Sequence, residues 1–278
     1  MKNTFLFFPE RLEGAKISIV GAPYDLNSSR RYGSRYAPEQ IREESLYLED
    51  NFRGVPLDLP VEDTGDVPAD SWNIFRRELG KRIGEITERK SIPLVLGGDH
   101  SITPVIIEAL DRKDISVVAI DAHLDFDEKL NGNRFSHGTP RRREAEILGG
   151  ERIHILGVRS WQKASRDRAE EIGVHIYDAF EIRRNGMDSV SLPEGPVYLT
   201  IDIDGLDPVH APGTGTPEPF GLSTWDILSV IDRLSSNIVG MDIVEVCPPA
   251  DINEITSTVA SRLAASFIAS FFSAERQH

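Results

Sequence analysis

Residues 116–125 read SVVAIDAHLD, an apolar run that passes directly into acidic and histidine residues. Residues 116–121 are typical of a buried strand, because the run is short and rich in β-branched side chains. Similar runs, each ending in a polar or glycine-containing stretch, lie at residues 16–24, 93–98, 152–158, 174–177, 196–202 and 238–246. The pattern predicts seven buried strands.

Helix-like stretches alternate with these strands. Alternation of this kind predicts an α/β fold with a parallel sheet covered on both faces. A chain of 278 residues can bury one substantial core, and we expect a single domain over residues 1–278. Such sheets place ligand sites at the carboxyl ends of their strands, so function is expected there. The predicted helices lie at residues 38–49, 73–90, 101–111, 162–172, 224–235 and 255–272.

The composition excludes several classes of protein. A formal net charge of -14 argues against a surface for nucleic acid or anionic membranes and favours the approach of a cationic small molecule. Cys247 is the only cysteine, which excludes an intramolecular disulfide and a thiolate-rich metal site. No apolar run approaches the ~20 residues of a membrane helix, and the first residues are too soon charged for a signal peptide. We expect a cytoplasmic protein.

Three strand ends carry acidic and histidine residues together. They read GGDHS at residues 97–101, DAHLD at residues 121–125 and DID at residues 202–204. Alternate residues of an extended backbone point to the same side, so Asp121, His123 and Asp125 can converge, as can Asp202 and Asp204. Four carboxylates gathered in a cleft repel one another and lose hydration, and two divalent cations would remove that conflict.

The candidate ligands offer only oxygen and imidazole nitrogen. This set suits Mn²⁺ better than Mg²⁺, while Zn²⁺, Co²⁺, Ni²⁺ and Fe²⁺ stay open from the residues alone. The competing interpretation is that each Asp-x-Asp is a solvated turn or helix cap and that His100 is a packed side chain. Three such clusters after three apolar strands favour the metal site. The predicted ligands are His100, Asp121, His123, Asp125, Asp202 and Asp204.

The three clusters resemble, in order and approximate spacing, the metal signatures of the ureohydrolases of the arginase/agmatinase family. The resemblance runs from Gly21 to about Ala260. Residues 204–219, DGLDPVHAPGTGTPEP, are more similar to agmatinases and guanidinobutyrases than to arginases. The resemblance implies a three-layer α/β/α fold with a parallel sheet of about eight strands, and a trimer or hexamer of identical chains.

The resemblance also implies two Mn²⁺ ions per subunit. One ion would be held by His100, Asp121, Asp125 and Asp202, and the other by Asp121, His123, Asp202 and Asp204. Asp121 and Asp202 would bridge the ions together with a hydroxide, whose formation near neutral pH is promoted by the cations. Asp125 would also be catalytic, because its carboxylate would orient that hydroxide.

Two further residues match the family's catalytic and substrate-binding positions. His137, within FSHGTP at residues 135–140, would shuttle a proton to the leaving amine, the alternative being a hydrogen-bonded loop histidine. Glu245, at the end of the strand 238–246, would pair with the substrate guanidinium, the alternative being a salt-bridged glutamate.

The loop LNGNR at residues 130–134 is expected to meet the far end of the substrate. Asn131 and Arg134 are therefore candidate substrate-binding residues. Arg134 would receive a substrate carboxylate, as in 4-guanidinobutyrate, unless it points to solvent. Residues 141–143, three arginines in a row, are expected at an exposed helix start or a subunit contact.

The family resemblance implies hydrolysis of a guanidino compound to urea and an amine. Agmatine, giving putrescine for polyamine synthesis, is the first expected substrate, followed by guanidinobutyrate and then arginine. Two other classes stay open: a two-metal phosphoesterase, and a metal-binding protein that has kept the fold without turnover.

Overall fold

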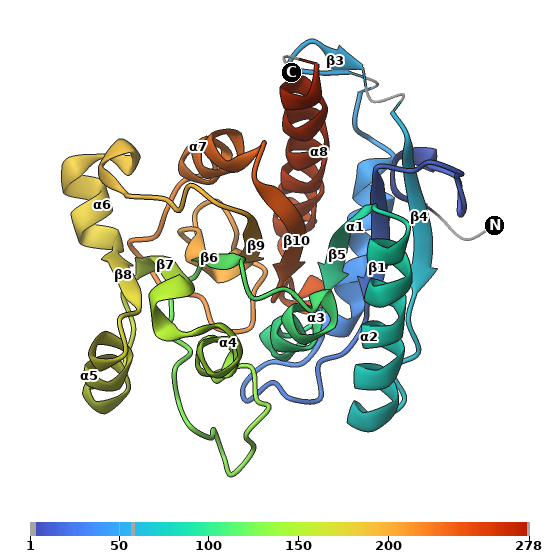
Figure 1. Cartoon of the computed structure of the whole chain (residues 1–278). Coiled ribbons are helices and arrows are strands. Elements are labelled where there is room, and N and C mark those ends of the chain that lie inside the picture. Colours follow the sequence, from blue (N-terminus) through green and yellow to red (C-terminus); the bar gives the residue numbers. More distant parts are fainter. Residues whose placement is uncertain (1–3, 50, 57–58, 277–278) are drawn as a thin grey trace.

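An eight-stranded parallel sheet forms the centre of the computed structural model, which describes residues 4–49, 51–56 and 59–276 (Figure 1). The strand order is β4-β1-β5-β10-β9-β6-β7-β8, and every pairing is parallel. This confirms the predicted fold. The strands are β1 (Ile17–Ala22), β4 (Val61–Asp66), β5 (Ile92–Gly97), β6 (Ser116–Ile120), β7 (Ile153–Val158), β8 (His175–Asp178), β9 (Val197–Asp202) and β10 (Ile238–Val244).

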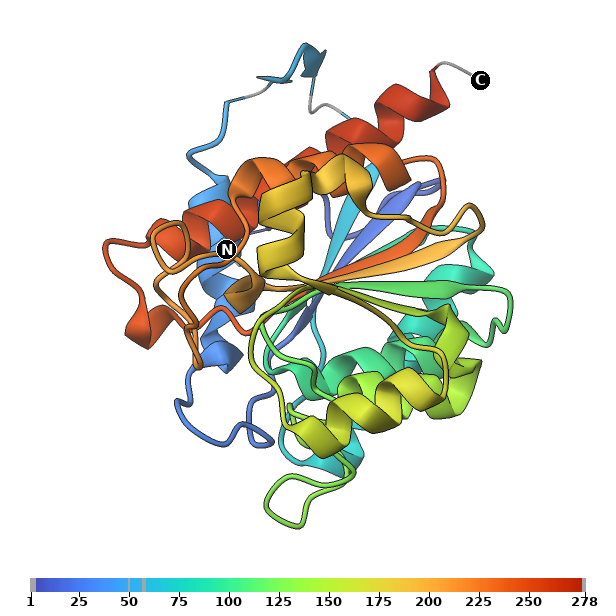
Figure 2. The same cartoon turned by 90° about the vertical axis from the view of Figure 1, so that its left-hand side faces the viewer.

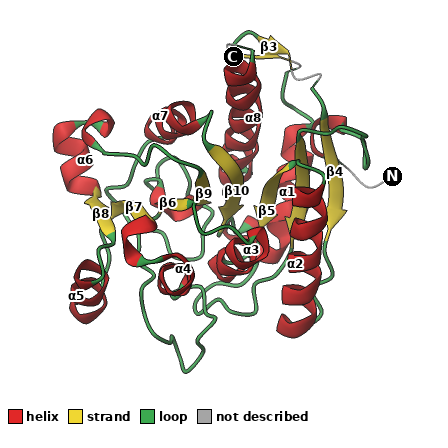
Figure 3. Cartoon of the chain, viewed as in Figure 1, coloured by secondary structure: helices red, strands yellow, loops and turns green. Residues whose placement is uncertain are grey.

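Helices cover both faces of the sheet and so complete three layers (Figure 2, Figure 3). One hydrophobic cluster lies under α1, α6, α7 and α8, and a second lies under α2, α3, α4 and α5. The helices are α1 (Ala37–Ser45), α2 (Trp72–Glu88), α3 (Thr103–Leu110), α4 (Pro140–Leu148), α5 (Lys163–Glu171), α6 (Ala179–Asn185), α7 (Thr224–Leu234) and α8 (Ile255–Glu275). A short antiparallel pair, β2 (Asn51–Phe52) and β3 (Val55–Pro56), packs against α8.

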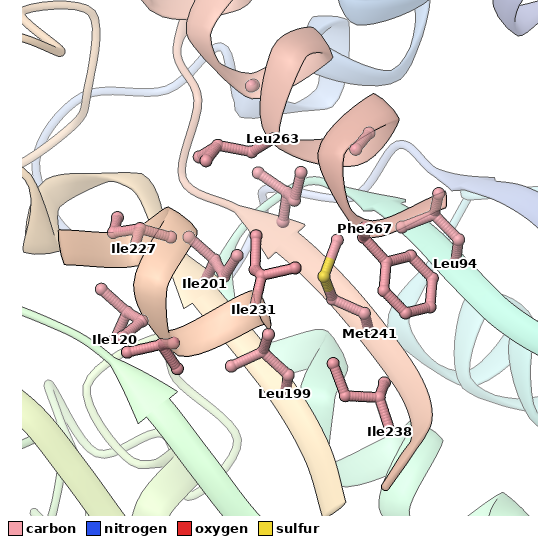
Figure 4. Close-up of a cluster of buried hydrophobic side chains, with 14 of the residues drawn as sticks. Leu94, Ile120, Leu199, Ile201, Ile227, Ile231, Ile238, Met241, Leu263 and Phe267 are labelled. Atoms are coloured by element: carbon pink, nitrogen blue, oxygen red, sulfur yellow. The ribbon is translucent and has the colours of Figure 1, made fainter. Parts of the chain in front are cut away.

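Apolar side chains lock the helices onto the sheet. Figure 4 shows Leu199 and Ile201 of β9 and Met241 of β10 facing Ile231 of α7 and Phe267 of α8. All five are fully buried. Because removal of apolar surface from water is the main driving force for folding, this packing holds the strand ends in fixed positions.

β4 is the sheet strand that the hydrophobic pattern does not predict, because its sequence, VEDTGD, is polar. Glu62 is nevertheless fully buried, and it accepts hydrogen bonds from the Ser18 hydroxyl and the Arg89 guanidinium, both at 2.7 Å. Asp63 is paired in the same way with the buried Arg42 guanidinium, at 2.7 Å and 2.9 Å. Paired charges thus replace apolar side chains in this edge strand.

The arginines at residues 141–143 correct one expectation. A helix, α4, does begin at Pro140, but Arg141 and Arg143 are buried instead of lying on an exposed surface. The reason is that α4 packs against α3. Part of the first turn of α4 therefore faces the interior of the protein. The short helix α6 lies outside the predicted set.

Helix α8 corrects a second expectation. By length and composition it could cross a membrane, although no such run was expected from the sequence. In the fold, 72% of its most apolar window is buried, so its apolar residues serve the protein core.

Two histidines stack on neighbouring strands. The rings of His154 in β7 and His175 in β8 lie 4.3 Å apart. Burial, and then the neighbouring His175, lower the pKa of His154 to about 4. Between pH ~6.5 and ~4 the unfolded chain therefore binds a proton on this group that the folded chain does not, so stability falls as pH falls.

Replacement of His154 with Phe, which keeps a ring for stacking, is expected to remove this contribution. The free energy of unfolding of the metal-free protein, measured by urea denaturation from pH 7 to pH 4, should then fall less steeply than in the wild type. Parallel pH profiles of the two proteins would contradict the role given to His154.

Candidate metal centre

All six predicted ligands come together at the carboxyl ends of β5, β6 and β9. They form two adjacent groups whose ligand atoms lie within 4.8 Å of one another. The first group is His100, Asp121, Asp125 and Asp202, and the second is Asp121, His123 and Asp204. Asp121 belongs to both, so its carboxylate lies where it could bridge two ions.

The first group is built around the ring of His100, which lies directly after β5. Its Nδ1 atom lies 3.0 Å from Asp202 Oδ2, 3.4 Å from Asp121 Oδ2 and 3.5 Å from Asp125 Oδ2. The His100 ring is fully buried, and one ligand atom from each of these four residues lies within 4.8 Å of the others. This is the arrangement of a ligand set for one cation.

The second group contains His123, whose side chain is 24% exposed. His123 Nδ1 lies 3.1 Å from Asp204 Oδ2 and 3.8 Å from Asp121 Oδ1. The hydroxyl of Thr216 donates to Asp204 Oδ2 at 2.9 Å and orients that carboxylate. Thr216 lies in the loop after β9 and was not predicted as a site residue.

Tight turns, and not extended strands, produce the convergence. Asp121 Oδ1 accepts a hydrogen bond from the His123 backbone N–H at 2.7 Å, and Asp125 has a left-handed backbone with φ of 47°. In the same way Asp202 Oδ1 accepts from the Asp204 backbone N–H at 2.9 Å. The predicted alternation along an extended chain is therefore wrong in detail. Asp202 belongs to the first group only, and its bridging role stays a prediction.

The buried carboxylates of the centre need a nearby positive charge to be stable in their ionised form. Asp121 Oδ2 is buried and has no hydrogen-bond partner among the described residues. Burial, and then Asp125 and Asp204, raise the pKa of Asp121 well above its usual range. Burial likewise raises the pKa of Asp125 to about 7. These carboxylates resist ionisation until a positive charge joins them, and their oxygen and imidazole donors fit a divalent metal ion.

His137 and Glu245 also meet at this end of the sheet. His137 Nδ1 lies 3.4 Å from Glu245 Oε1, and its Nε2 lies 2.8 Å from the Ser29 hydroxyl. Burial disfavours the charged ring, but Glu245 outweighs it and raises the pKa of His137 to about 9. The pair is suited to carrying a proton beside the metal centre.

Glu245 lies deeper than expected from the sequence. Strand β10 ends at Val244, and Glu245 takes up a left-handed backbone with φ of 62°. Glu245 is buried, and its Oε1 accepts a hydrogen bond from the His100 backbone N–H at 2.8 Å. In this structure it supports His137 and His100, and its predicted contact with substrate stays a prediction.

A pocket of about 300 Å³ opens over the metal centre, and its lining includes His123, Asp125, Asp202, Asp204 and His137. Leu130 is the residue through which the 130–134 loop lines it, among the described residues. Asn131 is exposed, with φ of 51°, and Arg134 forms an exposed ion pair with Glu146. The structure thus places both predicted loop residues outside the pocket lining.

Arg159 is a residue of the site that sequence reasoning missed. Its guanidinium donates to the backbone carbonyls of Asp204 at 2.7 Å, of Leu206 at 3.1 Å and of Glu218 at 2.8 Å. These bonds tie the segment after β9 to the end of β7. A half-buried arginine of this kind carries no signal in the chain beyond its place after a strand.

Comparison with known proteins gives the family. The family model described as "Arginase family" matches residues 15–269 of the chain. The chain belongs to the arginase family. It is similar to an agmatinase of Bacillus cereus, with 36% identity over 90% of each chain, and to a guanidinobutyrase of Pseudomonas aeruginosa, with 34% identity over 92% of this chain and 86% of that one. The solved agmatine ureohydrolase of Thermoplasma volcanium superposes with a TM-score of 0.92, at 35% identity, and the match covers 100% of this chain and 96% of that one.

Membership of the arginase family explains why the chain carries these two groups of metal-ligating side chains. The chain is a metal-dependent ureohydrolase of this family, and its substrate is a guanidino compound. The family resemblance inferred from the sequence motifs is thereby confirmed. The relatives are named for different substrates, so their names do not identify the substrate of this chain.

Proposed function

We propose that this arginase-family protein uses two Mn²⁺ ions to hydrolyse agmatine to putrescine and urea. The supporting observation is a carboxylate in the pocket, Asp127, which was not among the predicted site residues. Asp127 lies two residues beyond Asp125, hence at most roughly 7 Å along the chain from that ligand.

The pocket lining carries a negative charge in addition to the metal ligands. Apart from the ligands and His137, Asp127 is the charged side chain among the described residues that line the pocket, and Lys and Arg do not occur there. Its carboxylate accepts hydrogen bonds from the Ser165 hydroxyl and, at 3.4 Å, from the Gln162 amide. A carboxylate so placed attracts the ammonium of agmatine and repels the carboxylate of a guanidino acid.

Arg134 loses the role that favoured a guanidino acid. Its guanidinium pairs with Glu146 on the surface, outside the pocket lining. A guanidinobutyrase remains the second candidate, because a relative of that name shares 34% identity with the chain. A phosphoesterase is disfavoured, since the described pocket residues provide neither Lys nor Arg to face a phosphate.

The residues of the centre would bind the metal ions and deliver a proton. His100, Asp121, Asp125 and Asp202 would hold one ion, and Asp121, His123 and Asp204 the other. Bound divalent ions lower the pKa of water and so supply hydroxide near neutral pH. His137 lines the pocket and can deliver a proton to the departing amine, with Glu245 stabilising the charged ring. The trimer or hexamer and the cytoplasmic location stay predictions.

The experiment is urea release by Mn²⁺-loaded protein from agmatine, 4-guanidinobutyrate and arginine, with metal-stripped protein as the control. The expected result is metal-dependent formation of equal amounts of urea and putrescine from agmatine, with the highest kcat/KM of the three. A higher kcat/KM for 4-guanidinobutyrate would overturn the substrate assignment. Release of urea from none of the three would overturn the proposed activity.

A further inference from the structure

Helix α4 places a buried arginine against the back of the metal centre. Arg141 is 0% exposed, and its Nη2 lies 2.8 Å from His100 Nε2, on the opposite side of the ring from the ligand atom Nδ1. The same Nη2 lies 2.8 Å from Glu144 Oε1, one turn along the helix. Glu144 is also fully buried. The mechanism proposed above uses neither residue.

Two groups compete for His100 Nε2. The Thr200 hydroxyl lies 3.0 Å from it, and that hydroxyl donates its own proton to Asp242 Oδ1 at 2.5 Å. Thr200 can therefore only accept a hydrogen bond from Nε2, whereas Arg141 can only donate one. A neutral imidazole has one N–H, so Nε2 cannot satisfy both partners. Because the Arg141 guanidinium can only donate, its approach to 2.8 Å requires a lone pair on Nε2 and hence a neutral ring.

The two choices correspond to two states of the centre. When Nε2 accepts from Arg141, the proton is on Nδ1, which faces Asp202 Oδ2 at 3.0 Å and has no lone pair for a cation. When Nδ1 binds a cation, Nε2 carries the proton, donates to Thr200 and can no longer accept from Arg141. The proton changes atoms within one neutral ring, so no group gains or loses net charge.

Glu144 is in place to receive the released arginine. Its two carboxylate oxygens and the Nε and Nη1 atoms of Arg141 are buried without a hydrogen-bond partner among the described residues. The ion pair between them is close but not aligned for hydrogen bonding. A small rotation of the guanidinium would align it and satisfy these atoms.

We propose that Arg141 is a positioning residue that holds His100 in its metal-free tautomer and exchanges His100 for Glu144 when a divalent cation binds. Arg141 then competes with the cation, both through its hydrogen bond and through its positive charge behind the ring. The inference rests on the proposed cation binding at this centre, and does not depend on which substrate is hydrolysed.

The first test needs no cation. Nitrogen-15 NMR of the histidine side chains in metal-free protein, with a His100→Gln variant to assign the signal, reports which ring nitrogen of His100 carries the proton. The expected result is protonation at Nδ1 in the wild type and at Nε2 in Arg141→Met, where Thr200 is the remaining partner. Protonation at Nε2 in the wild type would overturn the proposal.

The second test measures Mn²⁺ affinity by equilibrium titration. A net hydrogen bond lost from the metal-free state corresponds to about a threefold to tenfold tightening of Mn²⁺ binding in Arg141→Met. Glu144→Gln should weaken binding, because Arg141 then has no carboxylate to turn to. The double variant Arg141→Met/Glu144→Gln, which buries no unpaired charge, should bind as tightly as Arg141→Met. If the double variant bound Mn²⁺ no more tightly than the wild type, the proposal would be overturned. Absence of Mn²⁺ binding in the wild type would instead refute the proposed function.

Discussion

Replacement of Asp121 with Asn is expected to lower urea release by more than about a hundredfold and, at the same time, to stabilise the metal-free protein. Asp121 is the ligand common to both groups, so its loss affects both ions. Even residues that merely support metal ligands contribute about 10- to 100-fold, which makes a hundredfold a lower limit here. The stabilisation follows because burial and the neighbouring carboxylates raise the pKa of Asp121 well above its usual range.

Thermal unfolding with and without Mn²⁺ checks both parts of this expectation. The metal-free variant should melt a few degrees higher than the metal-free wild type, since 1 kcal/mol corresponds to roughly 2–4 °C in a chain of this size. Addition of Mn²⁺ should raise Tm in the wild type and leave the variant unchanged. Asp70→Asn, an exposed aspartate outside the site, is the matched control and should behave as the wild type. A Mn²⁺-induced rise in Tm of equal size in Asp121→Asn would contradict the shared-ligand role.

Replacement of Asp127 with Asn is expected to lower kcat/KM for agmatine by about 10- to 100-fold. The variant keeps the size of the side chain but removes the charge that would pair with the substrate ammonium, and a hydrogen bond to a charged group contributes about 1.5–3 kcal/mol. For 4-guanidinobutyrate the same change removes a repulsion, so its kcat/KM should hold or rise. Steady-state urea release with both substrates provides the ratio.

Arg134→Gln is the natural control for this change. Arg134 pairs with Glu146 at the surface, so its loss should leave both substrates within about threefold of the wild type. If Asp127→Asn lowered kcat/KM equally for agmatine and 4-guanidinobutyrate, the role of Asp127 would be structural. The carboxylate would then not select the substrate by its charge. A selective loss of 4-guanidinobutyrate hydrolysis in Arg134→Gln would restore the role expected from the sequence.

Much of the fold follows from the sequence because its signals are local. Each buried strand shows as a short apolar run, and alternation with helices brings the carboxyl ends of β5, β6 and β9 to one edge of the sheet. The polar residues directly after those strands therefore had to meet there. The sequence therefore predicts all six candidate ligands, although turns at Asp121 and Asp202 bring them together and extended strands do not.

The remaining features depend on contacts between distant segments. Strand β4 is stabilised by Ser18, Arg42 and Arg89, which pair with its buried carboxylates from elsewhere in the chain. The burial of Arg141 depends on how α4 packs on α3, and residues 141–143 alone look like an exposed cationic run. Asp127 did carry a signal, since it continues the spacing of Asp121, His123 and Asp125, but a single carboxylate past the last ligand has no distinct pattern.

The most direct measurement is a titration of metal-stripped protein with Mn²⁺ in which bound ions and urea release from agmatine are followed in the same samples. We expect saturation at two ions per chain, with urea release absent from the metal-free protein and complete only when the second ion has bound. Saturation at a single ion with full activity, or urea release that persists without metal, would contradict a centre in which the two ligand groups act together.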